Sequence, residues 1–141
     1  MKILITGGNG YIGKSLYNNF KDEFDITLLT REEFDLCNYS SMLKFFNEKY
    51  FDVVLNCAAV GVNDVHSNDW KIMIDNIKIY DNLFRCRNYF KKLINFGSGC
   101  ELYNEDTPYS ISKRIIQRCS LSVSNFFISL DRVSTSLMKS I

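Results

Sequence analysis

Short apolar runs alternate along the chain with longer amphipathic segments. The runs favour strands, which we predict at residues 2–6, 25–30, 52–56, 92–96 and 125–130. The longer segments repeat apolar residues every three or four positions, which is typical of helices, and they cover residues 11–20, 40–50, 68–89 and 108–121. Strand and helix alternate about five times in this way. This order predicts an α/β fold, a doubly wound parallel sheet with helices on both faces.

The ends and faces of the helices give more detailed expectations. Ser40 is expected to cap the second helix and Thr107 the fourth, where Pro108 suits the first helical position. Tyr11 and Ile12 are expected to form a buried first turn of the first helix. The apolar residues of the second helix are expected on one side, and those of the third near one stripe: Met42, Leu43, Phe45 and Phe46 on the second helix, and Trp70, Ile74, Ile77, Tyr80 and Phe84 on the third.

Length and composition narrow the class of protein. The 141 residues suit a single domain, and 46% hydrophobic residues with a net charge of +1 exclude a disordered chain. Near neutrality argues against a nucleic-acid partner, and no apolar run approaches the roughly 20 residues of a membrane span. Glycines interrupt the first apolar stretch, so it is not a secretory signal. We therefore expect a cytoplasmic protein with no membrane partner.

The five cysteines are widely spaced and form no C-x-x-C pair, which argues against a disulfide framework or a structural zinc site. We expect four of them to be small buried side chains. There is one histidine, His66, so no multi-histidine metal site is available and no metal is predicted.

A glycine-rich segment between the first strand and the first helix is the strongest motif. In Thr6-Gly7-Gly8-Asn9-Gly10-Tyr11-Ile12-Gly13, we expect Gly7 to permit a tight turn, Gly10 to let a pyrophosphate approach and Gly13 to allow close packing. The backbone N–H groups of the first helical turn, at Tyr11 and Ile12, then face the anion. The alternative interpretation is an ordinary turn in which the glycines serve chain packing and bind no ligand.

The same segment overlaps a second pattern. Residues 8–15, Gly8 to Ser15, formally match the phosphate loop of nucleotide triphosphatases, with Lys14 for phosphates and Ser15 for magnesium. Two features count against it: residues 11 and 12 suit a helix, and the third strand ends in Asn56 where a magnesium-binding Asp would be wanted. A dinucleotide site is the favoured interpretation.

The end of the second strand bears on which dinucleotide binds. A carboxylate at this place binds the ribose hydroxyls of NAD, whereas an arginine accommodates the 2′-phosphate of NADP. Arg31 lies there, so NADP is predicted as the cofactor, although a solvated surface Arg31 is the alternative. Glu32, next to it, leaves NAD open.

Candidate catalytic residues follow the fourth strand. Tyr109 and Lys113 are four positions apart and share a helix face, so the ammonium would favour the phenolate and lower the pKa of Tyr109 for proton transfer. A surface pair is the alternative. Ser98 and Cys100 lie just after the strand, where α/β sheets hold ligands, although Ser98 can also be an ordinary turn residue.

The third strand ends in Asn56-Cys57-Ala58-Ala59, another place where a ligand can lie. Ala58 and Ala59 have small side chains, so a nicotinamide ribose could lie close to the backbone of this segment. Asn56, Ala58 and Ala59 therefore join the predicted cofactor contacts.

Together these motifs resemble the extended short-chain dehydrogenase/reductase family, the NAD(P)-dependent epimerases and dehydratases of nucleotide sugars. The matching segments are Thr6–Gly13, Asn56–Ala59, Ser98 and the Tyr109/Lys113 pair. Within the family the chain is most similar to the GDP-L-fucose synthase branch, on the further segments Thr30-Arg31-Glu32-Glu33, Ala58-Ala59-Val60-Gly61, Gly97-Ser98-Gly99-Cys100 and Pro108-Tyr109-Ser110-Ile111-Ser112-Lys113.

The resemblance implies a Rossmann domain over residues 1–130 and an NADP-dependent reductase or epimerase, an oxidoreductase or isomerase that acts on a nucleotide sugar. It implies that Tyr109 is the acid/base, that Lys113 holds the nicotinamide ribose, that Ser98 orients the sugar and that Cys100 moves protons. Residues 131–141 would be a short tail, with the substrate domain absent or supplied by another chain. In the family, the third and fourth helices pack between subunits, so a homodimer is also implied. A non-catalytic NAD(P)-binding or sensor module is the alternative.

Overall fold

The computed structural model describes residues 1–99, 106–122 and 127–130. Five strands and four α-helices alternate along them, with one short 3-10 helix, η1, before the fourth strand. Their bounds are β1 Lys2–Thr6, α1 Tyr11–Phe20, β2 Asp25–Leu29, α2 Tyr39–Phe46, β3 Phe51–Asn56, α3 Trp70–Arg85, η1 Arg87–Tyr89, β4 Phe90–Phe96, α4 Pro108–Ser122 and β5 Phe127–Leu130. The predicted order of elements is confirmed, and most boundaries fall within two residues of those expected.

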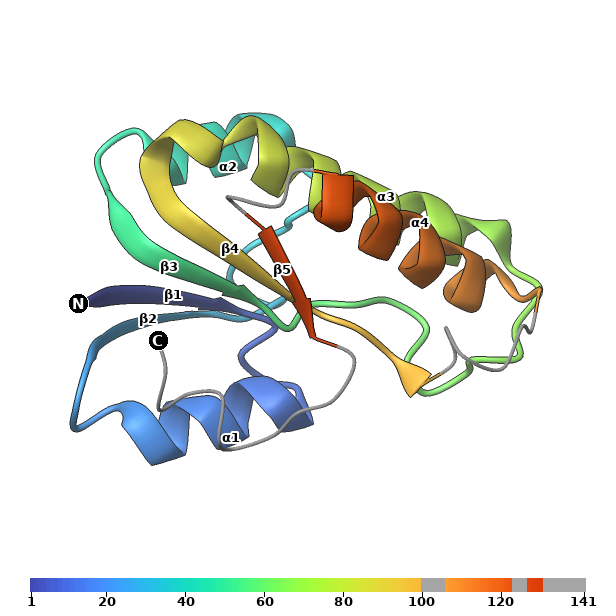
Figure 1. Ribbon diagram of the computed structural model, residues 1–141, viewed down its shortest axis with the longest axis horizontal. Coiled ribbons are helices and arrows are strands. Elements are labelled where there is room, and N and C mark those ends of the chain that lie inside the picture. The colour runs from blue at the N-terminus through green and yellow to red at the C-terminus, as the bar shows by residue number, and fades with distance from the viewer. Residues whose placement is uncertain (100–105, 123–126, 131–141) are drawn as a thin grey trace.

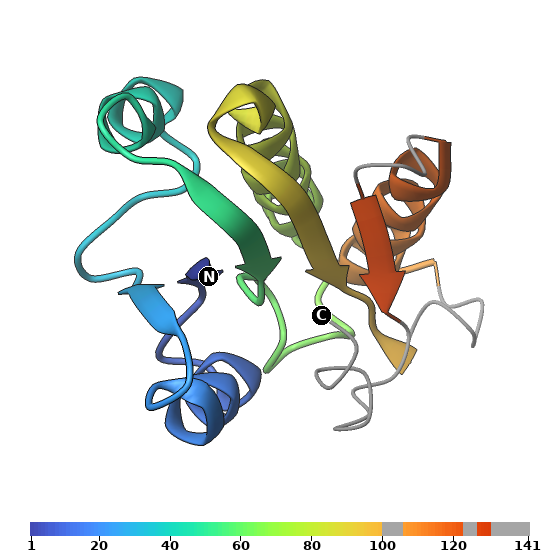
Figure 2. The same ribbon diagram turned by 60° about the vertical axis from the view of Figure 1, so that its left-hand side comes forward.

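The strands form one parallel sheet in the order β2-β1-β3-β4-β5. Helix α1 covers one face, and α2, α3 and α4 cover the other, as Figure 1 and the turned view in Figure 2 show. The order in which strands are added reverses between β1 and β3, and in open α/β sheets ligands bind outside the carboxyl ends of strands at such a point. The doubly wound parallel sheet is therefore confirmed.

Two apolar cores hold the layers together, because neighbouring residues of each strand point to opposite faces. On the α1 side, Ile3 and Ile5 of β1 pack with Leu16. On the other side, Leu4 packs with residues of β3, β4 and the remaining helices, including Met42 and Leu83. Each fully buried aliphatic side chain contributes about 1.5–3 kcal/mol, so both faces of the sheet stabilise the fold.

Three expectations about the helices are wrong. Asn38, not Ser40, caps α2, because its side chain accepts a hydrogen bond from the Ser41 backbone N–H at 3.1 Å. Tyr11 is 90% exposed rather than buried. On α3, Trp70 and Ile74 of the predicted stripe are exposed, whereas its Tyr80 is buried together with Ile72, Asn76, Ile79, Asn82 and Leu83, which lie outside the stripe.

The cap of α4 matches its prediction. The backbone N–H of Ser110 donates to the Thr107 side-chain oxygen at 3.3 Å, and the N–H of Ile111 donates to the Thr107 carbonyl at 2.9 Å. Thr107 and Pro108 thus fix where this helix begins, and with it the orientation of Tyr109 in the first turn.

The cysteines differ in burial. Cys86 is buried, Cys37 and Cys57 are partly buried, and Cys119 is exposed, which contradicts its expected burial. No helix within the described ranges is long and apolar enough to span a bilayer. Nor does the described part of the chain gather three or more side chains able to ligate a metal ion.

Candidate functional site

The glycine loop joins β1 to α1, at the point where the strand order reverses between β1 and β3. Gly7 has φ +68°, and a Cβ there would lie 2.7 Å from the Ala58 backbone nitrogen. A Cβ on Gly13 would lie 2.5 Å from the Gly7 carbonyl oxygen. Gly7 is therefore required by both its conformation and its contact with the end of β3, whereas Gly13 lets α1 pack directly on the loop.

Gly10 differs from these two glycines, and it indicates that the loop fits a dinucleotide. Among the described residues, a Cβ on Gly10 would meet only the Gly7 carbonyl oxygen, at 3.2 Å, so the space in front of it is open. Gly10 is also the N-cap of α1 and supplies no side-chain cap. The backbone N–H groups of the first turn, including Tyr11 and Ile12, thus remain available to an anion.

The same geometry disfavours the triphosphatase pattern. Residues 11–15 belong to α1 rather than to an extended loop, and Lys14 and Ser15 are exposed on that helix. The Ser15 carbonyl oxygen accepts a hydrogen bond from Asn19 Nδ2 at 2.7 Å. The loop therefore has the form expected of a dinucleotide-binding turn.

The segment after β2 lies against this loop. The Gly8 backbone N–H donates to the Leu29 carbonyl at 2.8 Å, and Asn9 Nδ2 donates to Glu32 Oε2 at 2.6 Å. Arg31 is exposed between these contacts, at the place predicted for the 2′-phosphate. Hydrogen bonds, first from its own backbone N–H, hold the pKa of Glu32 below its usual range.

A buried polar ladder crosses the carboxyl ends of three strands. Thr6 Oγ1 donates to Asn56 Oδ1 at 2.7 Å, and Asn56 Nδ2 donates to Asn95 Oδ1 at 2.7 Å. These residues occupy matching positions on β1, β3 and β4, and each is at most 4% exposed. Asn56 thus acts as a bridge inside the sheet, and its contact with a cofactor stays a prediction.

Tyr109 and Lys113 lie on the buried face of α4, at 5% and 7% exposure. Lys113 Nζ lies 5.9 Å from the centre of the Tyr109 ring and donates to the Phe96 carbonyl oxygen at 3.0 Å. Phe96 ends β4, two residues before the half-buried Ser98. The structure therefore brings the ammonium beside the tyrosine at the carboxyl end of the sheet, near Ser98, while Cys100 lies outside the described residues.

The lysine also reaches the end of β3. Burial raises the pKa of the Cys57 thiol to about 12, and the positive charge of Lys113 opposes that rise. Ala58 and Ala59 follow directly and are partly buried. Because Gly7 packs on the Ala58 backbone, the glycine loop, the Cys57–Ala59 segment and Lys113 border one region.

Asn76 connects this region to α4, and the sequence analysis missed it. Its side chain binds the Val60 backbone twice, accepting from the N–H at 2.8 Å and donating to the carbonyl at 3.0 Å. Its Nδ2 also donates to Ser112 Oγ at 3.1 Å, and Ser112 Oγ donates to the Tyr109 carbonyl at 2.6 Å. The sequence contained one signal of its burial, since Asn76 lies on the same helix face as the apolar residues 72, 79 and 83.

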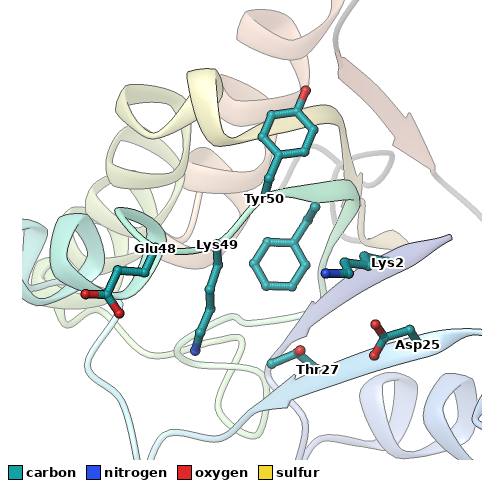
Figure 3. Close-up of a pocket in the computed structure, with 7 residues that line it drawn as sticks. Lys2, Asp25, Thr27, Glu48, Lys49 and Tyr50 are labelled. Carbon is teal, nitrogen blue, oxygen red and sulfur yellow. The ribbon is translucent and has the colours of Figure 1, made fainter.

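A hollow of about 290 Å³ lies at the opposite edge of the sheet, where the strands begin. Lys2, Asp25 and Thr27 border it on β1 and β2, and Lys49 enters from the loop before β3 (Figure 3). Its walls contain none of the predicted site residues. The chemistry discussed above therefore gathers at the carboxyl edge and not in this hollow.

Comparison with known proteins agrees with this geometry. Over 140 residues, 96% of this chain and 45% of the relative, the sequence is 24% identical to the GDP-L-colitose synthase of Yersinia pseudotuberculosis. The GDP-mannoheptose C4 reductase of Campylobacter jejuni, solved with NADP bound, is 27% identical with a TM-score of 0.74, covering 91% of this chain and 49% of that one. The chain spans about half the length of these relatives.

The GDP-L-fucose synthetase of Naegleria fowleri, solved bound to NADP, superposes with a TM-score of 0.76 over 91% of this chain and 52% of that one. Its identity of 22% shows the shared fold alone. The model of the NAD dependent epimerase/dehydratase family matches residues 3–127, which include the glycine loop, the end of β3 and the Tyr109/Lys113 pair. On this match and the geometry of those segments, the chain belongs to the NAD dependent epimerase/dehydratase family.

Proposed function

We propose that this chain supplies the cofactor-binding and acid–base half of an NADP-dependent reductase or epimerase of nucleotide sugars. The observation that carries the proposal is the position of Lys113, whose ammonium is bound to the Phe96 carbonyl at 3.0 Å and lies beside the Tyr109 ring. The buried Tyr109 and Lys113 lie at the same sheet edge as the open glycine loop, which supports them as the acid–base pair. Such a pairing of groups suits proton transfer next to a bound nicotinamide.

NADP is the proposed cofactor, with NAD as the second candidate. Gly7, Gly10 and Gly13 would hold the pyrophosphate against the start of α1, and Arg31 would face the 2′-phosphate. The solved reductase and the fucose synthetase named above both hold NADP, which supports this choice. When bound, the nicotinamide supplies or accepts a hydride.

The chain's own residues would manage the proton that accompanies the hydride. Tyr109 would donate its hydroxyl proton to the oxygen of a sugar ketone as that oxygen gains charge, and Lys113 would stabilise the resulting phenolate. Ser98 would orient the carbonyl by a hydrogen bond. Cys100 would exchange a proton on a neighbouring carbon during epimerisation, and this role rests on the resemblance of its sequence segment alone.

A non-catalytic cofactor-binding module is the second candidate. The open space in front of Gly10 supports it, because the glycine loop can hold a dinucleotide whether or not a sugar is turned over. Exposed apolar side chains on the outer faces of α3 and α4, at Trp70, Ile74 and Ile115, support a homodimer through these helices.

Binding and turnover separate the two candidates. The purified chain is titrated with NADPH, NADH and ATP–Mg²⁺ and is then assayed with a GDP-linked 4-keto sugar. Tyr109→Phe should abolish turnover and retain NADPH affinity, whereas Tyr50→Phe, at the opposite sheet edge, should change neither. Binding of NADPH without turnover would favour the module, and binding of neither dinucleotide would refute both.

A further inference from the structure

Two glutamates, Glu32 and Glu33, directly follow Arg31, and each accepts a hydrogen bond from a neutral side chain. Asn9 Nδ2 donates to Glu32 Oε2 at 2.6 Å, and Thr30 Oγ1 donates to Glu33 Oε2 at 2.9 Å. Across the described part of the chain, the Arg31 side chain has neither a hydrogen bond nor an ion pair. The positive charge of Arg31 helps to lower the pKa of Glu32, but its guanidinium N–H groups stay available although two carboxylates lie within two residues of it.

The Asn9–Glu32 bond spans two strand ends. Asn9 belongs to the glycine loop after β1, and Glu32 follows β2, whose last residue Leu29 pairs with Thr6 of β1. In doubly wound sheets the adenosine ribose lies against the end of the second strand, with the pyrophosphate at the helix start. The bond therefore lies beside the place of the ribose 2′-position.

We propose that Asn9 is a specificity-determining residue for the cofactor: it holds the Glu32 carboxylate at the glycine loop and so leaves Arg31 to bind the 2′-phosphate. This inference rests on the proposed function. Without Asn9, the Glu32 carboxylate could pair with Arg31 or accept a ribose hydroxyl, and both would favour NADH over NADPH.

The charge of Glu32 makes its position matter. A glutamate is ionised at neutral pH, and the lowered pKa of Glu32 agrees with this, so its carboxylate repels a phosphate more strongly the closer it lies. Both side chains are exposed, and exposed charges interact weakly because water screens them. We therefore expect a change of about fivefold in selectivity rather than several hundredfold.

The test compares the ratio of the NADH and NADPH dissociation constants between variants of the 141-residue chain. Asn9→Ala should lower this ratio about fivefold, mainly by weakening NADPH binding. The matched control is Asn19→Ala, which removes an exposed asparagine of α1 whose side chain, among residues 1–99, 106–122 and 127–130, bonds only to Ser15, and it should leave the ratio unchanged.

A double variant makes the inference sharper. If Asn9 acts by holding a charge, then adding Glu32→Gln to Asn9→Ala should restore the ratio, because no charge is left to hold. An unchanged ratio in Asn9→Ala, or no restoration in the double variant, overturns the inference while NADPH binding by the wild-type chain still supports the proposed function. Failure of the wild-type chain to bind either dinucleotide overturns both.

Discussion

Asn76 gives the most informative single perturbation, because one buried side chain joins three parts of the site. It is 3% exposed, and Asn76→Ala removes its two bonds to the Val60 backbone and its bond to Ser112 Oγ. Val60 lies in the loop that follows β3, and its backbone N–H and carbonyl then lose their hydrogen-bond partner. The Ser112 hydroxyl, which bonds to the Tyr109 carbonyl, loses its anchor on α3.

The expected cost follows from these three bonds. Each hydrogen bond contributes about 1 kcal/mol net, and a buried group left without a partner costs about 1–3 kcal/mol. Since water can reach the partly exposed Val60, we expect Asn76→Ala to lower the free energy of unfolding by about 3 kcal/mol. In a domain of this size that corresponds to a fall in Tm of about 10 °C.

Asn82→Ala is the matched control, since Asn82 lies on the same helix and is 5% exposed. Within the described part of the chain its side chain makes one hydrogen bond, from Nδ2 to the Leu36 carbonyl at 2.9 Å. Its loss should cost about 1 kcal/mol and should leave NADPH affinity unchanged. Urea unfolding followed by far-UV circular dichroism measures both costs, and NADPH titration shows whether only Asn76→Ala weakens binding. Equal destabilisation and equal NADPH affinity in the two variants would refute the reasoning.

Two further predictions concern the glycine loop and acid stability. Gly13→Ala should destabilise the fold by about 1–3 kcal/mol, because its Cβ would lie 2.5 Å from the Gly7 carbonyl oxygen. Gly10→Ala should lower the stability by under about 1 kcal/mol but abolish NADPH binding. Thermal melts and NADPH titrations check both variants, and equal melting temperatures of the two would contradict this prediction. A hydrogen bond from Lys91 holds the pKa of Asp52 below its usual range, so its contribution to stability is present above about pH 4 and is lost as pH falls through the lower, folded-state pKa. In melts across the acid range, the difference between wild type and Asp52→Asn should therefore shrink toward low pH, and a constant difference would count against this pairing.

Local patterns were sufficient to predict the elements and their order. Alternating apolar runs and helical periods give β1 to β5 with the helices between them, because strand and helix periodicities are set by backbone geometry. The same patterns misplaced the buried face of α3. Trp70 and Ile74 are apolar yet exposed, and Asn76 and Asn82 are polar yet buried, since each buried amide is bound to a backbone carbonyl from another segment. Periodicity cannot show such a bond, because its partner is distant in the sequence.

The sequence by itself determined the chemistry that is available: a glycine turn after a strand, Arg31 beyond the next strand, and a tyrosine and lysine one helical turn apart. Only the tertiary structure decided what these groups contact. It set Lys113 on the Phe96 carbonyl, joined Thr6, Asn56 and Asn95 across three strands, and bound Asn9 to Glu32. The physical reason is that residue types and local spacing fix which groups can donate, accept or carry charge, whereas the pairing of strands far apart in the chain fixes which of them meet.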